Sequence, residues 1–250
     1  MNSDYQRDGY CVVRNCFAAS ELASLADVAE CYHRHWLTHN AQRYAERAVN
    51  SADLTKPDYL DDSQRQLLFK LIASSKLFSI AQSIVGDDVL FMNTQLFFDP
   101  ANIQQKNYWH RDAQYHLSVE EQKRTLSETQ VIHCRIPLRN ERGIEVVPGT
   151  HRRWDTQDEL DVRLEQNGRR HSEELNGAKT ITLNAGDILV FSANMIHRGL
   201  YGGNRLSLDI LYCKPSEETL RFIDPEVLPG DEVTSPYDYP GVFKRVAPFL

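Results

Sequence analysis

Residues 108–112 read Tyr-Trp-His-Arg-Asp, and this stretch, together with one histidine far downstream, decides how the chain is interpreted. Side chains two residues apart on a strand point to the same face, so His110 and Asp112 are predicted to lie together. With His197 they supply two imidazoles and one carboxylate, a set typical of non-haem iron(II) oxygenases that leaves coordination positions open. Arg205 follows eight residues after His197, where it would grip a cosubstrate that carries a carboxylate. The sequence therefore predicts an iron enzyme.

Length and composition narrow the classes of protein. The chain has 250 residues, of which 41% are hydrophobic and 25% charged, ordinary values for a globular protein with a substantial core. Its formal net charge is −7 and no basic stripe stands out, so a nucleic-acid partner is not expected. No apolar run is long enough to span a bilayer, and residues 1–8 lack the basic start and apolar stretch of a secretion signal. The five cysteines are scattered without a C-x-x-C pair, which argues against a disulfide framework or a zinc site and favours a reducing cytoplasm.

Helical patterns come first along the chain, and strand patterns follow. Helices are predicted over about 21–36, from a capping box at Ser63 onward, and over 76–85, where Gly86 is a normal C-terminal cap. Short helices are expected after Ser118 and Asp155, and the proline-rich stretch from about residue 215 predicts a tail without long regular elements. One domain spanning residues 1–250 is the simplest organisation, since no internal repeat or low-complexity linker occurs. Strands are predicted over 89–98, 130–138, 144–147, 179–183, 187–191 and 205–213.

Two of the predicted strands alternate apolar and polar side chains. Their polar faces carry His133, Arg135, Arg205, Ser207 and Asp209. Such alternation fits a sheet with one face in solvent, and it also fits a barrel whose polar face lines a cavity and whose apolar face is covered by the N-terminal helices. The clustering of a histidine, an arginine and a serine within residues 197–207 favours the cavity.

The chain resembles the phytanoyl-CoA dioxygenase family of Fe(II)/2-oxoglutarate-dependent oxygenases in four motifs that follow the family's order. Residues 8–15 are similar to its opening strand, 109–112 to its H-x-D ligand motif, 146–151 to its P-G-[ST]-H turn, and 186–205 to its closing segment. The chain departs at residues 140–143, where Asn-Glu-Arg-Gly replaces the Asn-Gly pair that the family often carries before that turn. The resemblance implies a mainly β fold with flanking helices, the double-stranded β-helix (jelly roll, cupin-like).

The same resemblance implies a cofactor, Fe(II), and two cosubstrates, 2-oxoglutarate and O2. His110, Asp112 and His197 would hold the iron, and Arg205 would pair with the distal carboxylate of 2-oxoglutarate through its planar fork. The reaction would decarboxylate 2-oxoglutarate to succinate and hydroxylate a small organic molecule. Relatives that halogenate lack the carboxylate ligand, so hydroxylation is favoured here. Further cosubstrate contacts are expected from Ser207, Gln95, His133 and Arg135, and Tyr108 is expected to face the substrate.

Two alternatives stay open. A second H-x-E pattern runs from His171 to Glu173, but it lies in polar, loop-like sequence and is not expected to be the ligand pair. The protein is alternatively a catalytically silent jelly roll that binds metal or a small ligand, although a binding module has no need of three ligands and Arg205 together. The polar stretches 40–61 and 151–178 are expected to cover the mouth of the site.

Overall fold

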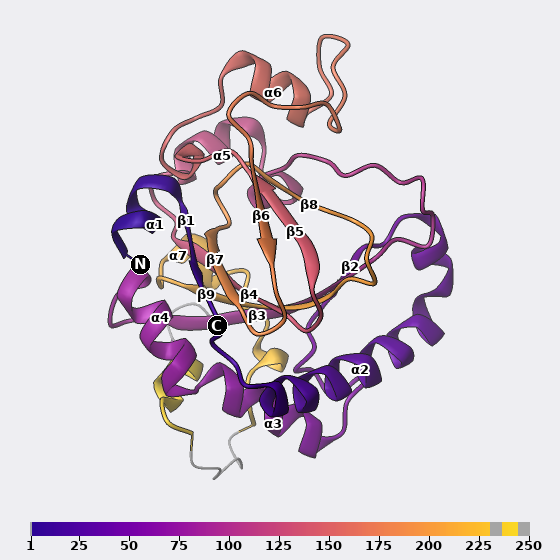
Figure 1. Cartoon of the computed structure of the whole chain (residues 1–250). Coiled ribbons are helices and arrows are strands. Elements are labelled where there is room, and N and C mark those ends of the chain that lie inside the picture. The colour runs from indigo at the N-terminus through magenta and orange to yellow at the C-terminus, as the bar shows by residue number, and fades with distance from the viewer. Residues whose placement is uncertain (1, 231–236, 245–250) are drawn as a thin grey trace.

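Two antiparallel sheets form the centre of the protein (Figure 1). The computed structural model describes residues 2–230 and 237–244. The larger sheet has the strand order β1-β7-β4-β9-β3-β2 and the smaller has the order β6-β5-β8. The strands are β1 (Tyr10–Val13), β2 (Asn50–Ala52), β3 (Leu90–Phe98), β4 (Val131–Pro137), β5 (Glu141–Val146), β6 (Lys179–Leu183), β7 (Ile188–Ser192), β8 (His197–Gly199) and β9 (Leu206–Cys213).

Helices cover the sheets on two sides. In the view of Figure 1, α2, α3 and α4 lie below the sheets, and α5 and α6 lie above them. The α-helices are α1 (Asn2–Asp8), α2 (Ala19–Glu46), α3 (Asp62–Ile72), α4 (Ser75–Val85), α5 (Val119–Thr125), α6 (Gln157–Arg163) and α7 (Glu217–Leu220). Short 3-10 helices are η1 (Asp112–Tyr115), η2 (Thr150–Arg152), η3 (Pro225–Val227) and η4 (Pro240–Phe243).

The two faces of the larger sheet are both buried, but they differ in chemistry. On the apolar face, Leu208 of β9 belongs to the same buried cluster as Ile72 of α3 and Leu77 of α4. On the polar face, Ser207 and Asp209 are fully buried as well. The polar residues are therefore not merely solvent-exposed, and the arrangement is the predicted jelly roll, with its polar face turned inward and its apolar face under helices.

Three helices differ from the prediction. Helix α2 begins at Ala19 and runs to Glu46, ten residues beyond the predicted end, and α3 and α6 begin at other caps. Helix α3 is capped by Asp61 and not by Ser63. The carboxylate of Asp61 accepts a hydrogen bond of 2.9 Å from the backbone N–H of Gln64, and the hydroxyl of Ser63 donates a hydrogen bond to the same carboxylate. Helix α6 is capped by Thr156, one residue beyond Asp155. The carboxylate of Asp155 has other partners, described below, so it is not free to cap a helix. The predicted Ser118 cap of α5 and the Gly86 cap of α4 are confirmed.

The tail after residue 215 contains only short elements within the residues described. Tyr239 stacks on Phe78 of α4 at 3.9 Å between ring centroids, and Phe243 packs edge-on against Phe69 of α3 at 5.6 Å. All five cysteines are free thiols.

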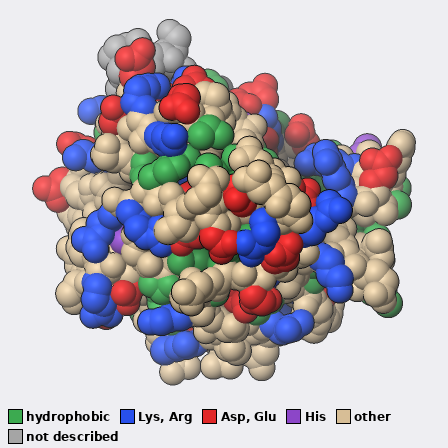
Figure 2. All heavy atoms as spheres, turned by 90° about the horizontal axis from the view of Figure 1, so that it is seen from above, with side chains coloured by type: hydrophobic (Ala, Val, Ile, Leu, Met, Phe, Trp, Pro, Cys, Tyr) green, Lys and Arg blue, Asp and Glu red, His purple; other side chains and the backbone are tan. Residues whose placement is uncertain are grey.

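Charge on the surface is mixed. On the face shown in Figure 2, lysine and arginine side chains are interspersed with aspartate and glutamate. Across residues 2–230 and 237–244, no single helix is both long and apolar enough to cross a membrane, and α3 with α4 meets that criterion only as a pair bent by 47°.

Candidate metal centre

The three predicted ligands meet at one point. The donor atoms of His110, Asp112 and His197 all lie within 4.8 Å of one another. The Nε2 atoms of His110 and His197 are 3.5 and 3.6 Å from the same oxygen, Oδ1 of Asp112. His197 is buried while His110 and Asp112 are half-buried, so the group is not sealed off from solvent.

The backbone places these ligands, and it does so differently from the prediction. His110 and His197 form an isolated antiparallel bridge, with N–H···O bonds of 3.0 Å in both directions. Asp112 opens η1, and its N–H donates to the carbonyl of Ala193 at 3.2 Å. The expectation that His110 and Asp112 lie on one strand is therefore wrong. The chain leaves the bridge and turns into a 3-10 helix, and the carboxylate reaches the two imidazoles from that turn.

Hydrogen bonds to carbonyl groups fix the tautomer of both imidazoles. Nδ1 of His110 lies 3.2 Å from the carbonyl oxygen of Tyr108, and Nδ1 of His197 lies 3.0 Å from that of Met195. A carbonyl oxygen only accepts, so each Nδ1 carries the proton. The Nε2 lone pairs that face Asp112 are then free to bind a metal.

The protonation states also suit a metal. Burial, followed by the neighbouring His197, lowers the pKa of His110 to about 3, and burial also lowers the pKa of His197. Burial acts to raise the pKa of Asp112, but the charge and hydrogen bond of His133 outweigh it and hold that pKa below its usual range. Two neutral nitrogens and one ionised oxygen are the form in which these side chains bind a divalent cation, so the residues fit Fe(II).

The second oxygen of Asp112 begins a buried series of ion pairs, here called the inner network (Asp112, His133, Asp209, Arg135 and Glu141). His133 contacts Oδ2 of Asp112 through Nε2 at 2.7 Å and Oδ2 of Asp209 through Nδ1 at 3.1 Å. Arg135 donates from Nη1 to Asp209 at 3.1 Å, and from Nε and Nη2 to Glu141 at 2.8 and 3.0 Å. Burial acts to lower the pKa of His133, but the two carboxylates outweigh it and raise that pKa to about 9. Negative and positive groups therefore alternate along the inner network.

Arg205 lies at the end of the inner network without joining it. Its Nε is 3.9 Å from Oε2 of Glu141, which is beyond hydrogen-bonding distance. Among the described residues, Nε and Nη1 of Arg205 are buried without a hydrogen-bond partner. Burial, followed by the charge of Arg135, lowers the pKa of Arg205 to about 10, so the guanidinium stays charged at neutral pH. A buried cation with free donors in a planar fork fits the distal carboxylate of 2-oxoglutarate.

A glycine makes room for this guanidinium. A Cβ atom at Gly199 would lie 2.7 Å from Nη1 of Arg205, closer than real Cβ contacts allow. Gly199 ends strand β8, two residues after the ligand His197. One short strand therefore supplies a metal ligand and the space for the predicted anion-binding side chain.

The remaining predicted site residues lie around this centre. The hydroxyl of Ser207 donates to Glu141 at 2.6 Å, and Gln95 is half-buried on β3, opposite Asp209 in the sheet. The ring of Tyr108 lies 5.2 Å from that of His110. The partners that the structure gives His133, Arg135 and Ser207 are protein carboxylates, and their contact with 2-oxoglutarate stays a prediction.

Sequence reasoning assigned no role to Glu141 or Asp209. Both have fully buried side chains and hold the guanidinium of Arg135 between them. The available signal for Asp209 was its place on the polar face of a predicted strand. Glu141 precedes the strand predicted over 144–147 and lacked that signal, and the structure places it in β5. Glu141 also falls within residues 140–143, where the chain departs from the family's pattern.

A jelly roll with this donor set is the arrangement of the non-haem iron dioxygenases that use 2-oxoglutarate and O2. A model of the phytanoyl-CoA dioxygenase (PhyH) family matches residues 5–204, and the chain belongs to that family. The protein is thus an Fe(II)/2-oxoglutarate-dependent dioxygenase, with Fe(II) as cofactor and 2-oxoglutarate and O2 as cosubstrates.

Several known proteins are similar to this chain. The ectoine dioxygenase of Sphingopyxis alaskensis is 24% identical over 218 residues, which cover 77% of this chain and 67% of the relative. The crystal structure of EctD from S. alaskensis with 2-oxoglutarate and 5-hydroxyectoine has a TM-score of 0.59 at 18% identity, covering 84% of this chain and 74% of that one. The 2-oxoglutarate-dependent epimerase SnoN from nogalamycin biosynthesis has a TM-score of 0.56 at 19% identity, covering 84% and 78%. These two structures share the fold of this chain.

Proposed function

We propose that this protein hydroxylates a small organic molecule and couples that reaction to the decarboxylation of 2-oxoglutarate to succinate. The observation that carries the proposal is the combination of a three-ligand metal set with a buried arginine that has unpaired donors. A protein that only binds a metal needs no anion site beside it, so the pair of features favours turnover over the catalytically silent alternative.

Each part of the site has a distinct task in this reaction. When bound, Fe(II) supplies the redox chemistry that activates O2 at the expense of 2-oxoglutarate. His110, Asp112 and His197 hold the metal and leave its other coordination positions to cosubstrate and O2. Arg205 binds the distal carboxylate of 2-oxoglutarate and thereby orients it toward the metal. The inner network holds Asp112 ionised, with Oδ2 against His133 and Oδ1 beside the Nε2 atoms of His110 and His197, so Oδ1 would be the oxygen that binds the metal.

The substrate docks, in this proposal, against an aromatic rim made of Tyr108, Tyr115 and His171. The rings of Tyr108 and Tyr115 lie 5.2 and 5.5 Å from that of His110, and the ring of His171 lies 5.5 Å from Tyr108. Tyr115 is 53% exposed, so this side of the metal is reachable from solvent. Phenols and an imidazole offer hydrogen bonds and ring faces without a fixed charge, which suits a compact polar molecule.

Anaerobic addition of Fe(II) and 2-oxoglutarate to the metal-free protein tests the cosubstrate site. We expect a charge-transfer absorbance in the visible region, and its absence would overturn the proposal. Isotopically labelled O2 then tests the chemistry, with ectoine as the first member of a panel of small polar metabolites. The expected product carries one labelled oxygen atom and forms together with an equal amount of succinate.

The other outcomes of this experiment identify other functions. Succinate formed with a product of unchanged mass would indicate an epimerase, as SnoN is. Binding of Fe(II) and 2-oxoglutarate with no succinate, across the whole panel, would indicate the silent jelly roll. Either result would replace hydroxylation as the function.

A further inference from the structure

A second group of buried charges lies beside the metal ligands and takes no part in the inner network. This group, here called the Arg111 triad, consists of Arg111, Asp155 and Arg163. The side chains of Asp155 and Arg163 are completely buried, and that of Arg111 is 2% exposed. In sequence, Arg111 stands between the ligands His110 and Asp112, while the other two residues belong to the segment around α6.

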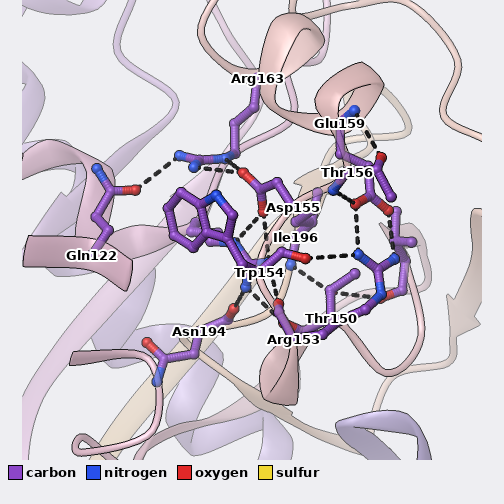
Figure 3. Close-up of polar contacts among 12 residues, drawn as sticks. Gln122, Thr150, Arg153, Trp154, Asp155, Thr156, Glu159, Arg163, Asn194 and Ile196 are labelled. Atoms are coloured by element: carbon purple, nitrogen blue, oxygen red, sulfur yellow. Dashed lines mark hydrogen bonds and ion pairs between the residues drawn. The ribbon is translucent and has the colours of Figure 1, made fainter. Parts of the chain in front are cut away.

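One carboxylate joins the two arginines. Oδ1 of Asp155 accepts from Nε and Nη2 of Arg111 at 2.8 and 2.7 Å, and Oδ2 accepts from Nε and Nη2 of Arg163 at 2.9 and 2.7 Å. Figure 3 shows the carboxylate of Asp155 and the guanidinium of Arg163 turned toward each other, with the indole of Trp154 beside them. The guanidinium carbons of both arginines lie within 5.7 Å of the centre of that ring. Both oxygens of Asp155 are therefore fully used.

Arg111 connects the segments that carry the metal ligands. Its Nη1 donates to the backbone carbonyl of Thr150 at 2.8 Å and to that of Asn194. Asn194 precedes the ligand His197 by three residues, and Arg111 adjoins both His110 and Asp112. A single guanidinium thus holds the H-x-D segment against the chain that leads to the third ligand.

Arg163 also contacts the segment that carries Asp112. Its Nη1 donates to the side-chain oxygen of Gln114 at 2.7 Å and to that of Gln122 at 3.0 Å. Gln114 lies in η1, two residues after Asp112, and its oxygen also accepts from the backbone N–H of Arg111 at 3.3 Å. The contacts therefore form a closed loop around the residues that present Asp112.

The triad holds protein segments together and is not a binding site; such a group is called a brace below. All the donor nitrogens of Arg111 have partners, its Nη2 also reaching the carbonyl of Arg153 at 3.1 Å, and none of the triad's polar atoms is among the buried unpartnered ones of the described residues. Residues 151–178 were expected to cover the mouth of the site. That expectation stays a prediction, and the part of this stretch around α6 is bound to the metal-ligand segment through completely buried charges.

We propose that Asp155 and Arg163 are positioning residues of the metal centre. They fix the guanidinium of Arg111, and through it they set the distance between the His110–Asp112 segment and His197. The inference rests on the metal centre of the proposed function but not on the reaction that the centre performs. Side chains that hydrogen-bond directly to metal ligands typically change metal affinity about 10- to 100-fold when they are removed. Asp155 and Arg163 act through Arg111, so we expect an effect at the lower end of that range.

Asp155→Asn tests the inference, with Glu159→Gln as the matched control. Glu159 lies in α6, the helix that carries Arg163, and is 6% exposed. It forms a two-contact ion pair with Arg153, and its side chain makes no hydrogen bond with Arg111. Co(II) is the probe, because its visible d–d absorption reports coordination geometry without turnover. We expect Asp155→Asn to weaken Co(II) binding about tenfold and to alter the absorption spectrum. Glu159→Gln should leave both as in the unmodified protein.

Stability is measured on the same samples by thermal unfolding. Equal Co(II) affinities and spectra for the two variants would overturn the inference and make the triad a contribution to stability alone. If Asp155→Asn does not fold, Asp155→Asn/Arg163→Met removes one charge of each sign and is measured instead, with the same expected loss and the same overturning result. Failure of the unmodified protein to bind Co(II) would count against the metal centre itself, which separates the two hypotheses.

Discussion

The inner network and the Arg111 triad both consist of buried charges in contact with the metal-ligand segment, but they end differently. The triad closes on itself, since Arg111 and Arg163 share the carboxylate of Asp155 and their remaining contacts go to amide oxygens and backbone carbonyls. The inner network stops short of Arg205, whose Nε and Nη1 lack partners among the described residues. A buried cation without hydrogen-bond partners is costly, so such a site favours binding of an anion, whereas a group with all its hydrogen bonds made only fixes geometry. Burial alone therefore does not distinguish a binding site from a brace, and the count of satisfied donors does.

The largest effect on metal binding is expected from removing one of the three metal ligands. His197→Ala leaves two donors, so tight binding of Fe(II) and all succinate formation should be lost. Calorimetric titration with metal under anaerobic conditions measures the first effect, and succinate assay the second. His39→Ala is the control, because His39 is an exposed histidine on α2 and has no place in the site. Equal losses in the two variants would show that the ligand set is misassigned.

Replacing Arg205 should weaken the binding of 2-oxoglutarate without weakening the binding of Fe(II). Arg205→Leu deletes a charge-assisted pair worth about 1.5–3 kcal/mol, so 2-oxoglutarate affinity should fall about 10- to 100-fold. Binding of Fe(II) should stay within about twofold, since Arg205 does not contact the ligands. Arg34→Leu, at an exposed position on α2, controls for loss of a positive charge. Parallel loss of metal and 2-oxoglutarate binding would contradict the role given to Arg205.

His133→Gln tests whether the inner network also supports the metal. His133 bridges Asp112 and Asp209 at 2.7 and 3.1 Å, and its loss frees the carboxylate ligand to rotate. We expect Fe(II) affinity to fall about tenfold, at the lower end of the range for such partners. The 2-oxoglutarate affinity of the metal-loaded variant, measured by the visible absorbance, should change less than in Arg205→Leu. An opposite ranking would reassign His133 to the cosubstrate.

Gly199→Ala also tests whether Arg205 binds 2-oxoglutarate and not the metal, because it displaces the guanidinium without removing it. The added Cβ would meet Nη1 of Arg205 at 2.7 Å, so the guanidinium must shift from its position. A cost of about 1 kcal/mol corresponds to roughly fivefold weaker binding of 2-oxoglutarate, with Fe(II) affinity unchanged. Identical 2-oxoglutarate titrations for Gly199→Ala and the unmodified protein would mean that this space is not used.

The smallest effect on the site is expected from a helix cap remote from both groups. Asp61→Ala removes the side chain that accepts from the backbone N–H of Gln64, which should cost about 1 kcal/mol in the free energy of unfolding. Urea unfolding measures the loss, and metal and 2-oxoglutarate titrations should match those of the unmodified protein. A change in either affinity would indicate that global stability, rather than local contacts, controls the site.

The alternation of side chains along β4 and β9 was sufficient to predict which residues share a face, because a strand has a period of two whatever it packs against. It left open whether the polar face meets water or the interior. The structure resolves this point, since Ser207 donates to Glu141 of the second sheet and is completely buried. A contact between two sheets depends on how they pack, and no local pattern in the chain encodes it.

The H-x-D motif also shows which features the sequence predicts and which depend on tertiary contacts. The identity of His110, Asp112 and His197 as the candidate set followed from residue types and motif order. Their assumed strand geometry was wrong, because His110 is bonded to His197 and Asp112 to Ala193, and both partners lie more than eighty residues away along the chain.

The sequence by itself determined the chemistry available to this protein: two imidazoles and a carboxylate in motifs of known order, an arginine after them, and alternating strands to carry them. Only the tertiary structure decided which arginine lacks a hydrogen-bonded carboxylate. Arg111, Arg135, Arg163 and Arg205 are all buried, and the sequence does not state which of them have hydrogen-bonded carboxylates. Three of them have carboxylates within hydrogen-bonding distance and Arg205 does not. The reason is that ion pairing depends on distances of a few ångströms between side chains from different strands and loops, and only the folded chain sets those distances.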